Sequence, residues 1–437
     1  MSRYTAYDKN YGKKIDKEIQ KQLDNIVKIV VRFVNPISII LVGGFGRREG
    51  SIVYKKNKFI PINDYDIYVI TSKKYPDEII EEMCRQASKA INKECIDFDN
   101  FEKDMEYDIE NTFYPDIRVL PFKELKTLPP FIKYFEMKNS MVIYGKQLLN
   151  EMPEFKVEDI PVQEGWRFLM NRLSLMIMHF SPKFIEHATE SDRERIINFN
   201  MKTALTCAEA LLLFSRKFIP SYENRAKILS KTFVQDFPEL AKSISNLPKI
   251  VKKYTNQKLK PNYNKIKNPV KDWFDIRDCA GEIMKFLLIK FTGKKPQNWQ
   301  KASNIINKSF SRFYIKGYIK AKFKIKNNFL LNLLSYPANL SLNLLFVKRI
   351  FRTKRKLHIN PILHPFIPPD LKLFAATPLI IFSLKRDGKI EKNLFKKSIK
   401  YLKQVYFDKN LKKDLNWEEM RRAYGTAFRL YGFQKLI

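Results

Sequence analysis

The stretch that most constrains this chain runs from residue 37 to residue 69 and reads ISIILVGGFGRREGSIVYKKNKFIPINDYDIYV. An apolar run from Ile37 to Val42 has the composition of a β-strand and stops at Gly43 and Gly44. Glycines at that point allow backbone N–H groups to come close to a bound group, which is typical of a phosphate-binding turn.

Two carboxylates follow. Asp64 and Asp66 flank Tyr65 at the start of a second apolar strand, and the alternation of a strand puts both carboxylates on one face. Adjacent carboxylates repel each other, and a hard cation such as Mg²⁺ removes the conflict while phosphate oxygens fill its other positions. Together with the glycine turn, the pair predicts a site for a metal-bound nucleotide.

These residues resemble the signature of the DNA polymerase beta-like nucleotidyltransferase superfamily: Gly-Gly or Gly-Ser after a strand, then Asp-hydrophobic-Asp, then a third carboxylate on a later strand. The third carboxylate is expected at Asp116, in YPDIRVLPF, where Asp116 and Arg118 share one strand face. The resemblance covers about residues 36–145. Arg47 matches an Arg of the family's glycine run, whereas Arg48 stands where small members often have a second Gly.

The resemblance implies an order of strand, hairpin, strand, helix and strand. The spacing of twenty positions from Gly44 to Asp64 is longer than usual in the family, and we interpret the excess as a longer hairpin with its tip at residues 54–59. Apolar residues at helical spacing predict one helix over residues 11–35. A second helix is expected from residue 75, with its inner face formed by Ile79, Ile80, Met83 and Ala87.

The resemblance also implies roles. Asp64 and Asp66 would hold two Mg²⁺ (or Mn²⁺) ions, Asp116 would join them on the metal that binds the acceptor hydroxyl, and Gly43, Gly44 and Arg47 would cradle the triphosphate. The predicted function is transfer of NMP from an NTP, with ATP the expected nucleotide, to a hydroxyl of an unidentified acceptor, with release of pyrophosphate. The alternative is a catalytically silent nucleotide-fold module whose basic region binds RNA or a membrane surface.

The predicted fold class is α+β, a small mixed-sheet nucleotidyltransferase domain followed by a largely α-helical region. The predicted division is an N-terminal helix (1–35), the catalytic domain (36–150), a helical bundle (151–292) and a basic, mostly helical region (293–437). The bundle sequence is similar to the α-helical half of nucleotidyltransferases that modify small or tRNA-like acceptors. That similarity makes five residues candidates for the acceptor or nucleotide side, of which we expect at most two to serve: Arg167, Arg172, Lys202, Tyr222 and Arg225.

The other acidic patterns, and the cysteines, are given no catalytic or metal-binding role. Asp97 and Asp99 lie in an acidic stretch, residues 97–110, that has no glycine turn before it, so a solvated segment is expected. Asp272, Asp275 and Asp278 suit the start of a helix. The four cysteines are too widely spaced for a zinc pattern and too few for a disulfide framework, which fits a reducing cytoplasm. The first residues are polar, so no signal peptide is predicted.

The positive charge is uneven. The chain of 437 residues has a formal net charge of +35, yet residues 36–149 carry 17 basic and 18 acidic residues, whereas residues 283–369 carry 18 basic residues and no acid. This asymmetry indicates a polyanionic partner, either RNA or anionic lipid, so the protein is expected in the cytoplasm or peripheral to a membrane. The alternative is the basic face of a packed helical domain. The oligomeric state is left open.

Within the basic region, residues 329–347 carry no charge. A polar stripe of Asn332, Ser335, Asn339 and Asn343, with Pro337 in the middle, favours an amphipathic helix pair, buried or on a membrane surface, over a membrane span. Prolines from residue 361 to 369 predict a linker before a last helical segment, residues 392–428. Four aromatic residues among the lysines could stack on unpaired bases or enter a lipid headgroup layer: Phe313, Tyr314, Tyr318 and Phe323.

Overall fold

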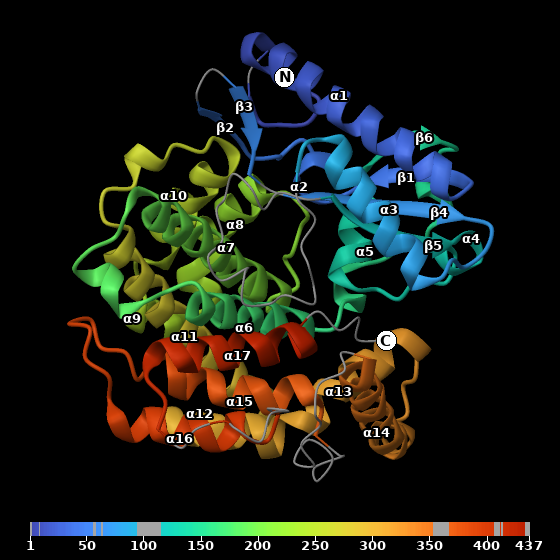
Figure 1. Ribbon diagram of the computed structural model, residues 1–437. Helices are drawn as coiled ribbons and strands as arrows, with labels where there is room; N and C mark the ends of the chain where they lie inside the picture. The colour runs from blue at the N-terminus through green and yellow to red at the C-terminus, as the bar shows by residue number, and fades with distance from the viewer. Residues whose placement is uncertain are drawn as a thin grey trace.

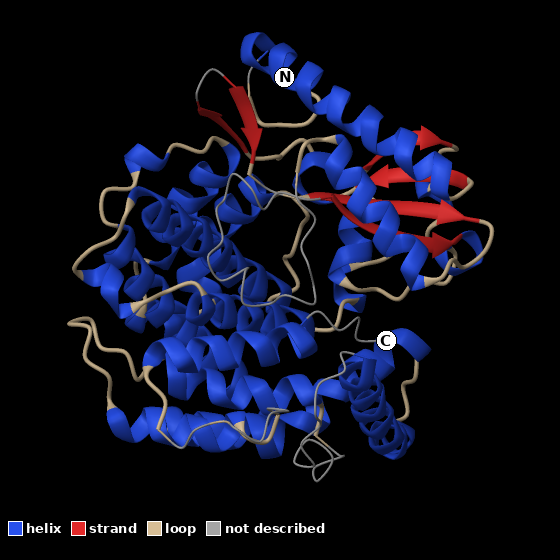
Figure 2. Ribbon diagram, viewed as in Figure 1, coloured by secondary structure: helices blue, strands red, loops and turns tan. Residues whose placement is uncertain are grey.

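The computed structural model describes residues 2–7, 9–55, 58–62, 64–93, 115–352, 367–405, 411 and 414–432. Within them the fold is mixed α+β, with a four-stranded sheet, a separate two-stranded hairpin and helices elsewhere (Figure 2). The predicted class, a small mixed sheet followed by a largely helical region, is confirmed at this level. The acidic stretch with Asp97 and Asp99 lies outside the described residues.

The main sheet has the strand order β5-β4-β1-β6. Its strands are β1 (Pro36–Leu41), β4 (Tyr65–Thr71), β5 (Pro115–Pro121) and β6 (Met141–Gly145). Strand β1 runs antiparallel to β4 and β6, while β4 and β5 are parallel. The hairpin interpreted from the long glycine-to-aspartate spacing is confirmed, because β2 (Ile52–Lys55) pairs antiparallel with β3 (Lys58–Pro61).

Two helices cover one face of this sheet, α1 (Lys9–Phe33) and α3 (Asp77–Ala90) (Figure 1). Ile15, Ile19 and Leu23 of α1 are buried against the strands. The predicted inner face of α3 was wrong at Ile79, which is 36% exposed. At about 100° per residue, Ile79 falls at the edge of the stripe that contains Met83.

The opposite face of the sheet packs on α4 (Phe122–Leu125), α5 (Ile132–Met137) and the segment that follows β6. Ile40, Tyr68 and Ile70 point to this side. Since side chains alternate along a strand, Asp66 lies on the same face as Tyr68. The candidate carboxylates therefore lie away from α1 and α3.

The rest of the chain is helical. Its α-helices are α6 (Gln163–Met178), α7 (Glu190–Phe214), α8 (Tyr222–Asp236), α9 (Pro238–Ser243), α10 (Leu247–Leu259), α11 (Pro269–Thr292), α12 (Trp299–Ile305), α13 (Ser311–Phe323), α14 (Asn328–Arg352), α15 (Pro369–Ile381), α16 (Lys392–Leu402) and α17 (Trp417–Gly432). One hydrophobic cluster joins Trp166 of α6, Trp273 of α11, Leu379 of α15 and Tyr424 of α17. The predicted helix-rich character of this region is thus accompanied by a shared core on both sides of residue 292.

Three predictions for the C-terminal part were wrong. Pro337 does not divide a helix pair, because α14 continues through it as one helix of 25 residues. Pro369 belongs to no linker: it is the first residue of α15, where a proline lacks an N–H that would be unpaired in any case. The last segment forms two helices, α16 and α17, instead of one. None of the described helices is long and apolar enough to cross a membrane.

Candidate functional site

Strand pairing brings two of the predicted carboxylates together. Asp66 of β4 and Asp116 of β5 are direct partners in the parallel register. Tyr65 points the opposite way, is fully buried, and donates its hydroxyl to Gln22 of α1 at 2.8 Å. The alternation predicted for Asp66 and Tyr65 is therefore present, and Asp64 precedes the strand on the approach to it.

The carboxyl of Asp66 has an unusual pKa. Burial raises it, and the negative charges of Asp116 and Asp64 raise it further, to about 7, against the opposing effect of Arg118 and Arg47. The shift shows that the three carboxylates are close enough to repel one another. A cation placed among them would relieve that repulsion.

Asp116 already has a cationic partner. Arg118, two residues along the same strand face, donates Nε to Oδ1 at 3.3 Å and Nη2 to Oδ2 at 2.5 Å. The guanidinium also lies over the ring of Tyr68, 5.9 Å from its centroid. The expectation that Asp116 and Arg118 share a face is confirmed, and their pairing holds the Asp116 carboxylate in a fixed orientation.

The glycine turn lies directly against Asp66. Gly43 has φ +66°, and a Cβ at this position would be 2.2 Å from Asp66 Oδ2. A Cβ on Gly44 would be 3.2 Å from Lys258 Nζ. Arg48, at the position of the family's second glycine, adopts φ 66°, the left-handed conformation that glycine takes most readily. The loop thus keeps the expected turn without that glycine.

Arg47 is buried beside the turn. Its Nη1 donates to Glu136 of α5 at 3.0 Å, and its guanidinium lies 5.5 Å from the ring centroid of Tyr222. Nε and Nη2 of Arg47 are buried and find no hydrogen-bond partner among the described residues. Two donors of Arg47 are therefore available to an anion that enters the site.

Three further cations come from the helices that face the sheet: Arg172 of α6, Lys202 of α7 and Lys258 of α10. Burial lowers the pKa of Arg172 and of Lys202, and the charges of Asp64 and Asp66 oppose the shift in both. Burial lowers the pKa of Lys258 to about 7, against the charges of Glu49 and Asp66. Of the three, Lys258 is placed at the glycine turn by its distance of 3.2 Å from a Cβ on Gly44.

The loop after the glycine turn is joined to the helical region by buried contacts. Glu49 accepts hydrogen bonds from the Ser221 hydroxyl at 2.8 Å and from the backbone N–H of Tyr222 at 3.1 Å, so it caps the start of α8. Lys258 Nζ donates to Ser51 Oγ at 2.8 Å, and that hydroxyl donates to the Lys258 carbonyl at 2.6 Å. These hydrogen bonds therefore connect the loop after the glycine turn to the helices α8 and α10.

Of the five helical candidates, Arg172 and Lys202 have pKa values on which the charges of Asp64 and Asp66 act. Arg167 instead bonds Glu164 at 3.0 Å and the Tyr318 hydroxyl at 3.1 Å. Arg225 bonds Glu136 and the Pro220 carbonyl, and Tyr222 packs between Arg225 and Arg47. These three residues therefore have partners within the protein.

Sequence reasoning missed Lys258 and Glu49. Lys258 lies in the polar run YTNQKLK, which resembles many solvated helix ends, and no local pattern distinguishes its buried ammonium. Glu49 follows two arginines, so a solvated ion pair was the simpler interpretation. Both depend on contacts between residues about two hundred positions apart.

The residues of the candidate site meet the requirements of a divalent metal ion only in part. Among the described residues no group of three or more His, Cys, Asp or Glu side chains is arranged to hold a metal ion, and Arg118 bonds both oxygens of Asp116. The donors themselves suit Mg²⁺ or Mn²⁺, since all three are carboxylates.

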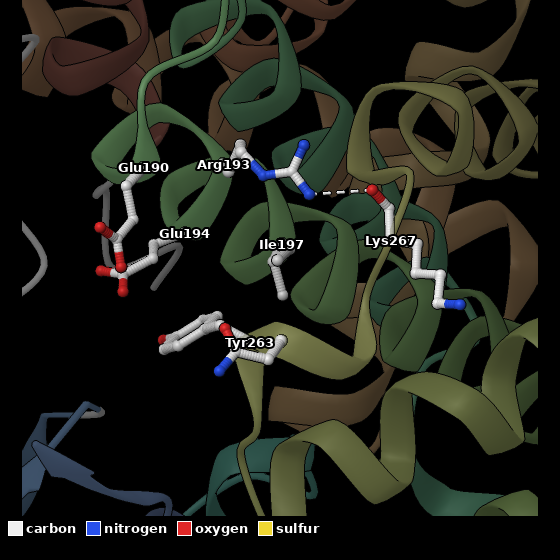
Figure 3. A pocket seen from close by; sticks show the side chains of 7 residues that line it. Glu190, Arg193, Glu194, Ile197, Tyr263 and Lys267 are labelled. Atoms are coloured by element: carbon white, nitrogen blue, oxygen red, sulfur yellow. Dashed lines mark hydrogen bonds between the residues drawn. The ribbon is translucent and has the colours of Figure 1, made fainter.

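A separate pocket of about 320 Å³ opens between the start of α7 and residues 263–267 (Figure 3). Glu190, Glu194 and Tyr263 line it, and Arg193 donates to the Lys267 carbonyl at 2.8 Å. None of the predicted site residues lines this pocket. Lys55 of the hairpin reaches its rim through an ion pair with Glu194 at 3.4 Å.

Comparison of the chain with profiles of known protein families, with curated proteins and with solved structures finds no match.

Proposed function

We propose that this protein is a metal-dependent nucleotidyltransferase that transfers NMP from an NTP to a hydroxyl of an acceptor. One observation carries the proposal. The register partners Asp66 and Asp116, with the Gly43 turn pressed against Asp66, face buried cations from three helices of the second part of the chain. Paired carboxylates opposite several cations suit a metal-bound triphosphate.

The cations support a triphosphate because they are buried with part of their hydrogen-bonding capacity unused. Nε and Nη2 of Arg47 and Nε of Arg172 find no partner among the described residues. Burial also disfavours the charged forms of Lys202 and Lys258. Buried cations and unpaired donors are costly unless an anion enters, so phosphate oxygens would satisfy the donors and keep both lysines protonated.

Asp64, Asp66 and Asp116 would hold the metal, which when bound would neutralise the carboxylates and favour ionisation of the acceptor hydroxyl. In the reaction the acceptor oxygen forms a bond to the α-phosphorus, and the bond from that phosphorus to the bridging oxygen breaks. Pyrophosphate leaves, and the hydroxyl proton passes to a carboxylate oxygen or to water. Arg47, Arg172, Lys202 and Lys258 would hold the negative charge that collects on the departing pyrophosphate.

A second candidate function is a nucleotide-binding module without catalysis. The close Arg118–Asp116 pair favours it, because a guanidinium already neutralises the third carboxylate. In that case Arg47, Arg172, Lys202 and Lys258 would bind the triphosphate, and no transfer would follow. The two functions differ in whether label moves to an acceptor.

The test is incubation of the purified full chain with each α-labelled NTP, Mg²⁺ or Mn²⁺, and a cell extract separated into RNA, lipid and small-molecule fractions. Transfer of label to one fraction by the wild-type protein, but not by Asp66→Asn, supports the enzyme. Asp387→Asn is the matched control, since Asp387 is exposed and lies in the turn after α15. Nucleotide binding without transfer to any fraction supports the silent module.

A further inference from the structure

Helix α14 has the reverse of the usual orientation of an amphipathic surface helix. Three residues of its polar stripe face inward beside the buried Leu331 and Leu342, because Ser335, Asn339 and Asn343 are 4%, 4% and 5% exposed, whereas Asn332 is exposed. Its apolar side is exposed, and within the described structure it carries Phe329, Leu330, Leu333, Leu340, Leu344 and Leu345. A surface helix of a globular protein normally turns its apolar stripe to the core, and a contiguous exposed apolar face marks an interaction site.

Hydrogen bonds fix this orientation. Asn343 Nδ2 donates to the carbonyl of Asn339 at 2.8 Å and to the carbonyl of Ile367 at 3.1 Å. Lys372 of α15 donates Nζ to Asn343 Oδ1 at 3.2 Å, and Lys372 is 1% exposed. Rotating α14 to bury its exposed leucines would break the bonds of Asn343 to Ile367 and Lys372, which lie outside the helix, so the outward apolar face is built into the fold.

Positive charge surrounds the same helix. Lys320 and Lys322 end α13, Lys324 and Lys326 lie in the turn to α14, and all four side chains are exposed. Lys324 adopts φ 53° in that turn, which brings α13 and α14 side by side at the margin of the molecule (Figure 1). No acidic residue occurs from residue 283 to residue 369, so the local field is positive.

We propose that α14 and these four lysines dock the protein on an anionic lipid surface. The aliphatic face would enter the boundary between headgroups and acyl chains, and the lysines would contact lipid phosphates. For a helix with an apolar face and basic neighbours, both the burial of apolar surface and the attraction to anionic headgroups favour binding to the membrane. The polar side remains bonded to α15, so the protein lies on the membrane surface. This proposal does not depend on nucleotidyl transfer.

The structure favours lipid over RNA because three of the four aromatic residues considered for base stacking are packed against other residues of the protein. Tyr314 and Tyr318 are buried, and their hydroxyls donate to Asp370 at 2.7 Å and to Glu164 at 2.8 Å. Phe313 stacks on Phe291. Of the four aromatics considered for base stacking, Phe323 alone is largely exposed, at 59%. Leucines offer no stacking surface for bases, whereas they suit acyl chains.

The test is flotation of the full chain with vesicles of phosphatidylcholine alone and with vesicles that also contain phosphatidylglycerol. We expect the protein to float with the anionic vesicles only, and less so at high salt. The triple variant L333S, L340S and L344S should bind these vesicles about tenfold more weakly. Its melting temperature should stay that of the wild type, because all three side chains are exposed.

Matched controls separate the two contributions. V234S removes a 72% exposed apolar side chain on α8 and should bind vesicles as the wild type does. Changing Lys320, Lys322, Lys324 and Lys326 to Gln should weaken binding about tenfold or more. The same change at four exposed lysines of α8 to α10 should leave it within about twofold, although the net charge falls equally: Lys231, Lys242, Lys249 and Lys252.

Three results would overturn the proposal. The first is equal flotation of the wild type and the leucine variant. The second is a protein that does not bind anionic vesicles but binds single-stranded RNA in a gel-shift assay. If that binding requires Lys320, Lys322, Lys324 and Lys326, RNA is the partner. The third is a wild-type dimer by light scattering that L333S, L340S and L344S convert to a monomer without any lipid binding, which would identify a second copy as the partner of α14.

Discussion

Asp66 and Asp116, fifty positions apart in the chain, are register partners on neighbouring parallel strands. Their side chains therefore lie on one face of the sheet at the same level, and the charge of Asp116 raises the pKa of Asp66, which burial raises most. This relationship gives the site its negative side, and the buried cations of α6, α7 and α10 give it the positive side. The predictions below test one side at a time.

Asp66→Asn should abolish transfer of labelled NMP. A neutral amide keeps the shape of the side chain but removes the charge that would hold the metal, which should cost several kcal/mol of transition-state stabilisation. The measurement is the rate of label transfer with saturating Mg²⁺, compared with Asp387→Asn. A wild-type rate in Asp66→Asn would show that the metal assignment is wrong.

The same substitution should stabilise the metal-free protein above neutral pH. The pKa of Asp66 is raised from 3.8 to about 7 in the folded state, so its contribution to stability is present below about pH 4 and is lost as pH rises through about 7. Asp66→Asn cannot ionise and should be more stable than wild type by about 1–3 kcal/mol near pH 8. Urea unfolding in EDTA should show a much smaller difference near pH 4.

Asp116→Ala should separate binding from catalysis. As the ligand on the acceptor side, Asp116 matters more for turnover than for nucleotide binding, so affinity for the NTP should stay within about tenfold, or ~1.4 kcal/mol, while turnover is lost. Titration calorimetry and the transfer assay measure the two quantities. Weaker binding together with a lower melting temperature would mark Asp116 as a structural partner of Arg118.

Gly43→Ala should disrupt the site because the new methyl group would collide with Asp66 and because the backbone would be strained. The φ of +66° costs about 1–3 kcal/mol for a residue with a side chain, and the new methyl group would meet Asp66 Oδ2 at 2.2 Å. Gly293→Ala is the matched control, because Gly293 has φ +69° with no atom within 4 Å. Gly293→Ala should lose the stability that the strained φ costs, Gly43→Ala should lose at least as much, and Gly43→Ala alone should lose transfer. Loss of transfer in both would attribute the effect to stability.

Lys258→Met should weaken metal-free ATP binding, and the loss should depend on pH. The folded-state pKa of Lys258 is about 7, so the ammonium is fully charged only at lower pH. In EDTA the wild-type affinity for ATP should rise as pH falls from about 8 to about 6, and Lys258→Met should flatten this dependence. Lys260→Met, at an exposed position two residues on, should behave as wild type. An unchanged pH profile in Lys258→Met would remove Lys258 from the nucleotide site.

The sheet could be predicted from sequence because its signals are local. Alternation around Asp66 and Asp116 and the stop at Gly43 each occupy a few residues, and the structure has the corresponding strands and turn. The positive side of the site could not be predicted in full. Lys258 becomes a site residue only through its contact with Ser51, 207 positions away, and helical spacing does not report such contacts.

The C-terminal part misled sequence analysis for a different reason. Of the polar stripe predicted in α14, Ser335, Asn339 and Asn343 share one buried side, whereas Asn332 is exposed and does not belong to it. Polarity alone does not say which side faces the protein. A hydrogen-bonding partner, Lys372 on α15, decides it, and that helix begins in a proline run interpreted as a linker. Pro337 is tolerated because the helix continues on both sides of it.

The cap that Glu49 provides for α8 and the bond between Ser51 and Lys258 also bear on synthesis of the chain. While a ribosome has released only the first 150 residues, the glycine turn has its strands but neither Ser221 nor Lys258 to bond with. The loop after the turn would then lack the contacts that define it in the complete fold. A nascent chain would hence complete the candidate site late, after residue 258 has left the exit tunnel, so premature termination upstream of α10 would yield a sheet without the contacts of Ser51 and Glu49 to the helices.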